Sequence, residues 1–279
     1  MNSTSKGYLY ALLTAICWST SGLFVKIVDQ SALVISGITA IVAFLFNRII
    51  IGKKIKINKY IVIVGFVQFM MHITFVYANK LTSVGNAIVL QYSSMIFVLL
   101  YESIEKKKLP MKYQWIVILL AFSGMFIFFM DSFSMDGFLG NILAIISGAF
   151  FGLQFFLNTK KQADPSSSLT IQYLFSIGIM VIYVFIEKNV QVSLKDLAYL
   201  GGSGIFQTAL AGLFFSKCIT LIPAFTANVI CMSEVIFSPL WAFLFLQEFF
   251  TPFAFIGSMI IIASLFINIY FEYKLKLPK

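Results

Sequence analysis

One carboxylic acid, Glu234, lies near the centre of a long apolar run and offers the clearest chemistry in this sequence. An ionisable side chain is costly in hydrocarbon, so such a residue usually faces a cavity or a partner. Its protonation could be coupled to substrate binding or to proton movement, which makes Glu234 our candidate for proton coupling. The alternative is a protonated or hydrogen-bonded residue that only packs helices together.

Polar and aromatic side chains recur every three or four residues in other apolar runs, which places them on one face of a helix. Their amide, hydroxyl and aromatic groups could bind a small solute, or could simply join helices. We expect these faces to turn toward one cleft. The candidate substrate-binding residues are Trp18, Gln68, His72, Gln91, Tyr92, Ser94, Gln154, Asn158, Gln207, Cys231, Glu234, Ser238 and Trp241.

The composition shows which elements must position these residues. Of 279 residues, 60% are hydrophobic and 11% are charged, and the mean hydropathy of +0.94 excludes a soluble domain. Apolar runs of about 20 residues have the length of membrane-spanning helices. Ten runs can be marked, at Tyr8–Val28, Ser31–Ile51, Tyr60–Asn79, Val84–Ile104, Trp115–Met130, Leu139–Leu157, Leu169–Glu187, Leu197–Lys217, Pro223–Leu246 and Phe253–Phe271.

The basic residues predict how these runs cross the membrane. Lys and Arg in short loops are retained on the cytoplasmic side. With ten spans and both termini inside, all of the 20 basic residues except Lys26, Lys80, Lys188 and Lys195 fall on that side. We therefore expect a multi-pass protein of the cytoplasmic (inner) membrane of a prokaryote. Because the basic residues are scattered between apolar runs, nucleic acid is not an expected partner.

The sequence predicts neither a metal site nor a cofactor. His72 is the only histidine and has no second ligand at metal-binding spacing. The three cysteines, Cys17, Cys218 and Cys231, lie in or beside apolar runs and are expected to be free thiols. The glycine pairs follow no strand, so they do not indicate a nucleotide-binding loop.

The two halves of the chain resemble each other. Residues 81–89 align with residues 221–229 at an offset of 140, and Gln68 aligns with Gln207 at an offset of 139. The expected repeats are residues 1–135 and 136–279, with five spans in each. Because five is odd, the second repeat must enter the membrane from the opposite side. The predicted fold is an all-α integral membrane protein of ten transmembrane helices in two inverted repeats, an architecture that generally carries small molecules by alternating access.

Three segments carry a resemblance to a known family: residues 15–20, the run from Ser233 to Glu248, and its counterpart at residues 90–97. At these residues the chain resembles the EamA-type family of the drug/metabolite transporter superfamily. The resemblance implies a secondary transporter of a small metabolite, such as an exporter of amino acids or related amphipathic compounds, with or without coupling to protons. A multidrug or nucleobase transporter of the same fold is the alternative.

Other classes of membrane protein find less support. An intramembrane enzyme would need Glu234 and His72 to act together, and no zinc-protease motif or nucleophile triad is present. A channel or a purely structural protein would not need the repeats. We expect no enzyme activity. The expected partners are a small-molecule substrate, the lipid bilayer and, if transport is coupled, protons, with the protein acting as a monomer or homodimer.

Overall fold

The structure, a computed structural model, describes residues 2–20, 28–52, 54–131, 137–188, 190–237, 241 and 251–275. This part of the chain is helical apart from turns and short connections, and it contains no β-strand. The helices are α1 (Ser3–Trp18), α3 (Ala32–Phe46), α4 (Lys59–Leu81), α5 (Val84–Gln91), α6 (Ser94–Lys106), α7 (Lys112–Phe128), α8 (Phe138–Asn158), α9 (Pro165–Glu187), α10 (Leu194–Ser203), α11 (Ala211–Cys218), α12 (Ala224–Cys231) and α14 (Pro252–Leu275). Two π-helical segments, η1 (Asn47–Ile51) and η2 (Gly204–Leu210), continue α3 and α10.

Seven helical segments among the described residues are long and apolar enough to cross a bilayer. They are Ala32–Ile50, Lys59–Leu81, Val84–Lys106, Phe138–Asn158, Pro165–Glu187, Leu194–Cys218 and Pro252–Leu275, and shorter apolar helices cover Lys112–Phe128 and Ala224–Phe237. The chain is therefore a multi-pass membrane protein. The count of ten spans stays a prediction, because the 16 residues of α1 rise only about 24 Å against a hydrocarbon core of about 30 Å.

Short polar side chains fix where several of these helices begin. The side chains of Ser31, Ser83 and Ser193 each accept a hydrogen bond from the backbone N–H three residues later. Asn58 and Asp164 do the same for α4 and α9. These caps satisfy N–H groups that have no partner inside the helix, which matters most where a helix starts close to hydrocarbon.

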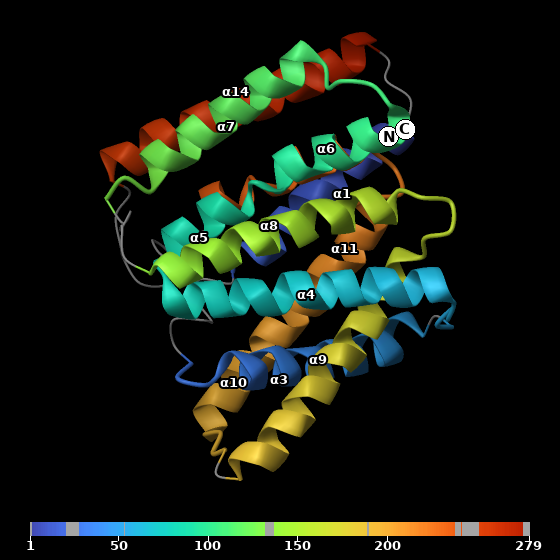
Figure 1. Ribbon diagram of the computed structural model, residues 1–279, viewed down its shortest axis with the longest axis vertical. Helices are drawn as coiled ribbons and strands as arrows, with labels where there is room; N and C mark the ends of the chain where they lie inside the picture. Colours follow the sequence, from blue (N-terminus) through green and yellow to red (C-terminus); the bar gives the residue numbers. More distant parts are fainter. Residues whose placement is uncertain are drawn as a thin grey trace.

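The helices pack as neighbouring pairs across the molecule. In Figure 1, α7 and α14 lie side by side at the top, α4 and α8 cross the middle, and α3 and α9 pack near the bottom. The pair of α7 and α14 approaches closely because both helices carry glycine. A Cβ atom on Gly257 would lie 2.6 Å from the Gly124 carbonyl oxygen and 2.6 Å from the Phe128 amide nitrogen. Small residues thus allow backbone contact, as is usual between helices in membranes.

Two central helices are interrupted at corresponding positions in the two halves. One break, at residues 92–93, separates α5 from α6, and the other, at residues 232–233, ends α12. The breaks are 140 residues apart, the offset expected from the sequence alignment of the halves. In both, backbone amides bond to carbonyls three residues back rather than four, which tightens the turn. The bonds are Met95 N to Tyr92 O and Val235 N to Met232 O, each 3.1 Å long.

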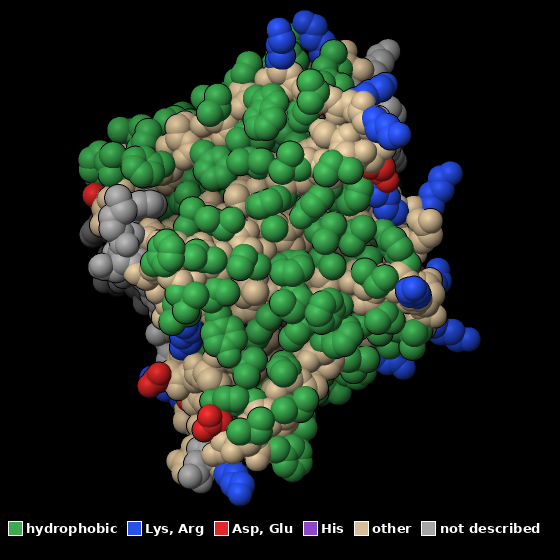
Figure 2. All heavy atoms as spheres, in the orientation of Figure 1, with side chains coloured by type: hydrophobic (Ala, Val, Ile, Leu, Met, Phe, Trp, Pro, Cys, Tyr) green, Lys and Arg blue, Asp and Glu red, His purple; other side chains and the backbone are tan. Residues whose placement is uncertain are grey.

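The outer surface is suited to lipid. Figure 2 shows hydrophobic side chains over most of the visible face. Large apolar side chains are widely exposed, among them Leu119 at 70% and Phe185 at 78%. Lys and Arg side chains gather along the right and upper edges of this view, and most of the visible acidic side chains lie at the opposite edge. This separation of charge is typical of a protein with its basic loops on one side of a membrane.

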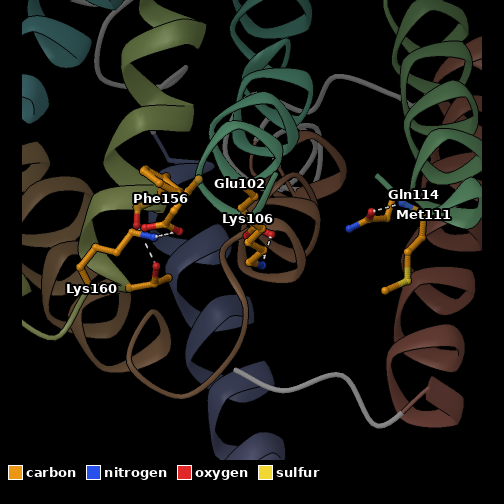
Figure 3. Close-up of polar contacts among 8 residues, drawn as sticks. Glu102, Lys106, Met111, Gln114, Phe156 and Lys160 are labelled. Atoms are coloured by element: carbon orange, nitrogen blue, oxygen red, sulfur yellow. Dashed lines mark hydrogen bonds and ion pairs between the residues drawn. The ribbon is translucent and has the colours of Figure 1, made fainter. Parts of the chain in front are cut away.

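We call the end that carries Lys106, Lys160 and the C-terminal end of α14 the Lys-rich end. Figure 3 shows its polar contacts, in which Lys106 is 2.8 Å from Glu102 and Lys160 pairs with Glu105. The Lys160 ammonium also lies 3.7 Å from the centre of the Phe156 ring. Because exposed ion pairs contribute at most about 1 kcal/mol, these contacts mainly orient the loops.

Candidate functional site

Two adjoining pockets lie between the helices in the middle of the molecule, and they share Trp18, Met71, His72 and Gln207. We call the first the carboxylate lobe, after Glu234. Its other lining residues are Ser19, Phe75, Ile88, Gln91, Phe151 and Val235. We call the second the amide lobe, after its glutamines. Its other lining residues are Gln68, Gln154, Leu169, Gln172, Tyr173, Thr208, Gly212 and Phe215.

The two helix breaks place the key group of the carboxylate lobe. Glu234 follows the break after α12, and Tyr92 lies in the break between α5 and α6. The Tyr92 hydroxyl donates a hydrogen bond of 2.8 Å to Glu234 Oε1 and lies 3.2 Å from the Cys231 carbonyl oxygen. Tyr92 is fully buried. The carboxyl group is thus held by a residue of the other half of the chain, with one edge toward the pocket.

Aromatic rings form the apolar wall of the carboxylate lobe. Trp18 at the end of α1 meets Phe151 of α8 edge to face, with ring centroids 5.5 Å apart. These two residues occupy corresponding positions in the two halves, because α1 aligns with α8 at an offset of 133. Tyr92 packs against the other side of Phe151 at 6.2 Å. A carboxylate beside aromatic rings is an arrangement that suits an organic cation with apolar surface.

Amide groups without partners distinguish the amide lobe. Gln68 of α4 is 1% exposed, and neither its Oε1 nor its Nε2 has a hydrogen-bond partner among the described residues. Gln154 Oε1 from α8 is likewise buried and unpaired there. Buried polar groups are nearly always hydrogen-bonded, and each exception needs an explanation such as a bound ligand or water. Gln68 could serve a ligand as both donor and acceptor.

A chain of polar side chains connects His72 to the far wall of the amide lobe. Ser36 Oγ lies 3.0 Å from His72 Nδ1 and donates to Ser176 Oγ at 3.2 Å. Gln172 Nε2 donates to the same Ser176 oxygen at 3.2 Å. The histidine is therefore fixed by α3 and α9 while it lines both lobes.

Gln91 and Gln207 also line the lobes but are tied to the protein. Gln91 Nε2 donates to Ser147 Oγ at 2.9 Å, and Ser147 in turn donates to the Met71 carbonyl at 2.9 Å. Gln207 Oε1 accepts a hydrogen bond of 2.7 Å from Ser203. These partners hold the two amides in place beside the cavity, so that their remaining polar atoms are positioned before a ligand binds.

Seven of the predicted binding residues line the two lobes: Trp18, Gln68, His72, Gln91, Gln154, Gln207 and Glu234. Tyr92 lines neither lobe, but its hydroxyl group holds the Glu234 carboxyl group by a hydrogen bond. Ser94 is fully buried and exchanges hydrogen bonds with Asn228 of α12, at 3.0 and 3.2 Å. That pair joins the two halves rather than lining either pocket.

The other four predicted residues lie elsewhere. Asn158 donates to the Gln154 carbonyl at 2.8 Å near the Lys-rich end, and Cys231 is buried with its sulfur 3.8 Å from the Ala11 carbonyl oxygen. Trp241 Nε1 donates to the hydroxyl of Ser19, a lining residue, at 2.7 Å. Ser238 lies outside the described residues. The binding roles of all these residues stay predictions.

Sequence reasoning missed several lining residues, among them Gln172, Tyr173 and Thr208 of the amide lobe. Gln172 and Ser176 are four residues apart in the seventh apolar run, and that spacing was a usable signal of a polar helix face. Thr208 offered no such signal, because its place in the lobe depends on the π-helical segment η2. Wider turns of this kind change which side chains face a neighbour.

The charges around the lobes restrict what can bind there. Among the described residues that line either lobe, Glu234 is the one carboxylic acid, and neither Lys nor Arg is present. The described part of the chain also holds no cluster of three or more His, Cys, Asp or Glu side chains that could bind a metal ion. The lobes therefore offer one carboxyl group, aromatic rings and neutral amides.

Comparisons with known proteins identify the family of the chain. The sequence profile of the EamA-like transporter family matches residues 5–130 and again residues 138–270. A solved structure, described only as the crystal structure of a protein, superimposes with a TM-score of 0.79 and 11% sequence identity, covering 96% of this chain and 98% of its own. No curated protein sequence matches. Because the family profile covers nearly the whole chain in two repeats, the protein belongs to the EamA-like transporter family, within the drug/metabolite transporter superfamily.

Proposed function

We propose that this protein is a secondary transporter that exports a small amphipathic metabolite across the cytoplasmic membrane of a prokaryote. In this proposal, residues 1–135 and 136–279 are inverted repeats that rock against each other, with both termini in the cytoplasm. Two observations support alternating access: the family profile matches each half, and the central helices break at corresponding positions. Broken helices at a repeat interface are a common form of transporter binding site.

The observation that carries the proposal is the contact between Glu234 and Tyr92. It joins the two helix breaks across the halves of the chain, with 2.8 Å between the Tyr92 hydroxyl and Glu234 Oε1. A ligand that attracts the carboxylate into the carboxylate lobe would compete with this contact. A ligand in the lobe would therefore weaken a contact between the two halves. A carrier needs such an effect if substrate binding is to favour the change from one access state to the other.

The lining predicts the chemical class of the substrate. An amine would pair with the Glu234 carboxylate and lie beside the rings of Trp18 and Phe151. The amide lobe would accept the polar remainder of the molecule, since the Gln68 amide offers both a donor and an acceptor. An amino acid fits if its carboxylate is bound by amide N–H groups. A related amphipathic amine fits without that requirement.

Proton coupling follows if Glu234 exchanges a proton for the substrate. A protonated Glu234 has no charge to attract an amine, so binding of the amine and of the proton would be mutually exclusive. In an exporter, protons would enter as the substrate leaves. His72 would contribute a hydrogen-bonding ring nitrogen to both lobes.

The test is a flux measurement in proteoliposomes with an internal pH dye. Amino acids, amines, nucleobases and drugs would be offered to the wild type, to Glu234→Gln and to Glu105→Gln as a control. Glu105 is a suitable control because it pairs with Lys160 at the Lys-rich end, away from both lobes. We expect saturable amine flux with proton movement in the wild type and the control, and at least a 10-fold loss in Glu234→Gln. Equal flux and proton movement in all three proteins would refute the coupling role.

A nucleobase or drug carrier is the second candidate, and the amide lobe favours it. A planar heterocycle could stack on Trp18 and satisfy both atoms of the Gln68 amide. Such a substrate would need no charge on Glu234. Nucleobase flux that survives Glu234→Gln but is lost in Gln68→Met would support this candidate over the amine carrier.

A further inference from the structure

A buried carboxylic acid, Glu272, lies on α14 near the Lys-rich end, outside both lobes. Ser264, Asn268 and Glu272 follow one another at steps of four residues, and all three are buried, with Glu272 7% exposed. Residues at this spacing share one face of a helix. The rest of α14 is strongly apolar, so this polar face has been placed toward the protein rather than toward lipid.

Groups from three other helices surround the Glu272 carboxyl group. Thr226 of α12 and Tyr8 of α1 are in hydrogen-bonding contact with it through their hydroxyl groups. Tyr113 of α7 lies close enough to interact electrostatically. Asn268 Nδ2 donates to the Thr226 hydroxyl oxygen at 3.2 Å. A run of hydrogen bonds thus leads from Asn268 through Thr226 to Glu272 and ties α14 to α12 and α1.

Two acceptor atoms at the ends of this run are left without donors. Glu272 Oε2 and Asn268 Oδ1 are buried, and neither has a hydrogen-bond partner among the described residues. They belong to side chains four residues apart on one helix face. Both atoms can only accept when Glu272 is ionised, so in that state neither can satisfy the other.

We propose that Glu272 is a proton-binding site, in which the bound proton closes this run of hydrogen bonds into a ring. A proton on Oε2 converts that atom into a donor, which then bonds to Asn268 Oδ1 and satisfies both unpaired atoms at once. The proton is taken from water at the surface pocket that Tyr8 and Glu272 line together with Asn2, Thr4 and Lys274. No other group has to gain or lose charge.

The titratable groups around Glu272 are two tyrosines, a second acid and a lysine. Tyr8 and Tyr113 face it from α1 and α7, and tyrosine ordinarily ionises only near pH 10. Glu102 of α6 interacts electrostatically with Tyr113, and Lys274 shares the surface pocket from α14 itself. Protonation of Glu272 would therefore hold α14 against α1 and α12, and its release would loosen this packing.

The first test is infrared spectroscopy of protein labelled with carbon-13 glutamate, titrated from acid to alkaline pH. We expect a protonated-carboxyl band that is lost in Glu272→Gln but kept in Glu234→Gln, so that the two acids are distinguished. Tyr8→Phe removes one donor to the carboxylate, and the band should then persist to higher pH. If no band disappears in Glu272→Gln at any pH, the proposal is overturned.

The second test is thermal unfolding across the same pH range in sodium and in choline buffers. Because the ring is complete only in the protonated form, the wild type should lose several degrees in Tm as pH rises. Glu272→Gln keeps an amide donor in place of the protonated acid, and its Tm should change less with pH. A rise in wild-type Tm caused by sodium at alkaline pH would instead identify a cation site and overturn the proton proposal.

Discussion

Replacing Gln68 by Met should make the protein more stable and a poorer carrier. The Gln68 side chain is 1% exposed with both polar atoms unpaired among the described residues. Burying an unsatisfied polar group costs about 1–3 kcal/mol, and Met has a similar length without that cost. The free energy of unfolding should therefore rise by about 1–3 kcal/mol. Loss of one or two hydrogen bonds to the substrate should raise the apparent KM by about 2-fold to 10-fold.

The matched control is Gln172→Met in the same lobe. Gln172 is also a buried glutamine, but its Nε2 donates to Ser176 Oγ at 3.2 Å. Removing that donor should lower the free energy of unfolding by about 1 kcal/mol. Both variants would be unfolded by denaturant in the same micelles, and flux would be measured in proteoliposomes at a series of substrate concentrations.

The opposite signs expected for the two variants make the reasoning refutable. If Gln68→Met destabilises the protein as much as Gln172→Met does, the Gln68 amide must already be satisfied without substrate, for instance by trapped water. If Gln68→Met leaves the KM unchanged while stability rises, the amide does not contact the substrate. Either result would remove the amide lobe from the binding site.

Two further predictions concern packing and the polar chain. Gly257→Ala should destabilise the protein by about 1–3 kcal/mol, because its Cβ would meet backbone atoms of α7. The control Gly178→Ala, whose Cβ would meet nothing within 4 Å, should stabilise the protein by about 0.5–1 kcal/mol. Equal effects of the two variants in denaturant unfolding would contradict the close contact between α7 and α14. Ser36→Ala removes the partner of His72 Nδ1. This variant should lower the free energy of unfolding by about 1 kcal/mol and change the NMR signal of the His72 ring nitrogens. The control Ser123→Ala, at an exposed site, should leave the stability and the NMR signal unchanged.

The fold followed from the sequence as far as it depends on hydrophobicity and local pattern. Long apolar runs must become helices in a bilayer, because every backbone group needs a partner within its own segment. The Ser, Asn and Asp side chains between the runs cap those helices, as at Asn58 and Asp164. The breaks after Gln91 and Cys231 were not predicted, but they are 140 residues apart, the offset at which the two halves align in sequence.

The sequence also identified part of the candidate site. Glu234 and Gln68 stood out because polar groups inside an apolar run must find a cavity or a partner. The apolar run alone does not show whether a polar residue within it lines a cavity or bonds to another side chain. Gln91 lines the carboxylate lobe, whereas Ser94, three residues later, bonds to Asn228. Only the tertiary structure distinguishes them, because the helix break between these residues turns their side chains to different neighbours.

Glu272 shows the same division between local pattern and tertiary structure. Its position at the edge of the last apolar run is typical of a residue that reaches solvent, and nothing in the local sequence predicts otherwise. Its burial results from Thr226 and Tyr8, which come from segments 46 and 264 residues away in the chain. The sequence by itself determined the helices, their repeat and the polar residues within them. The tertiary structure decided which polar atoms remain unpaired, because pairing depends on contacts between segments distant in sequence.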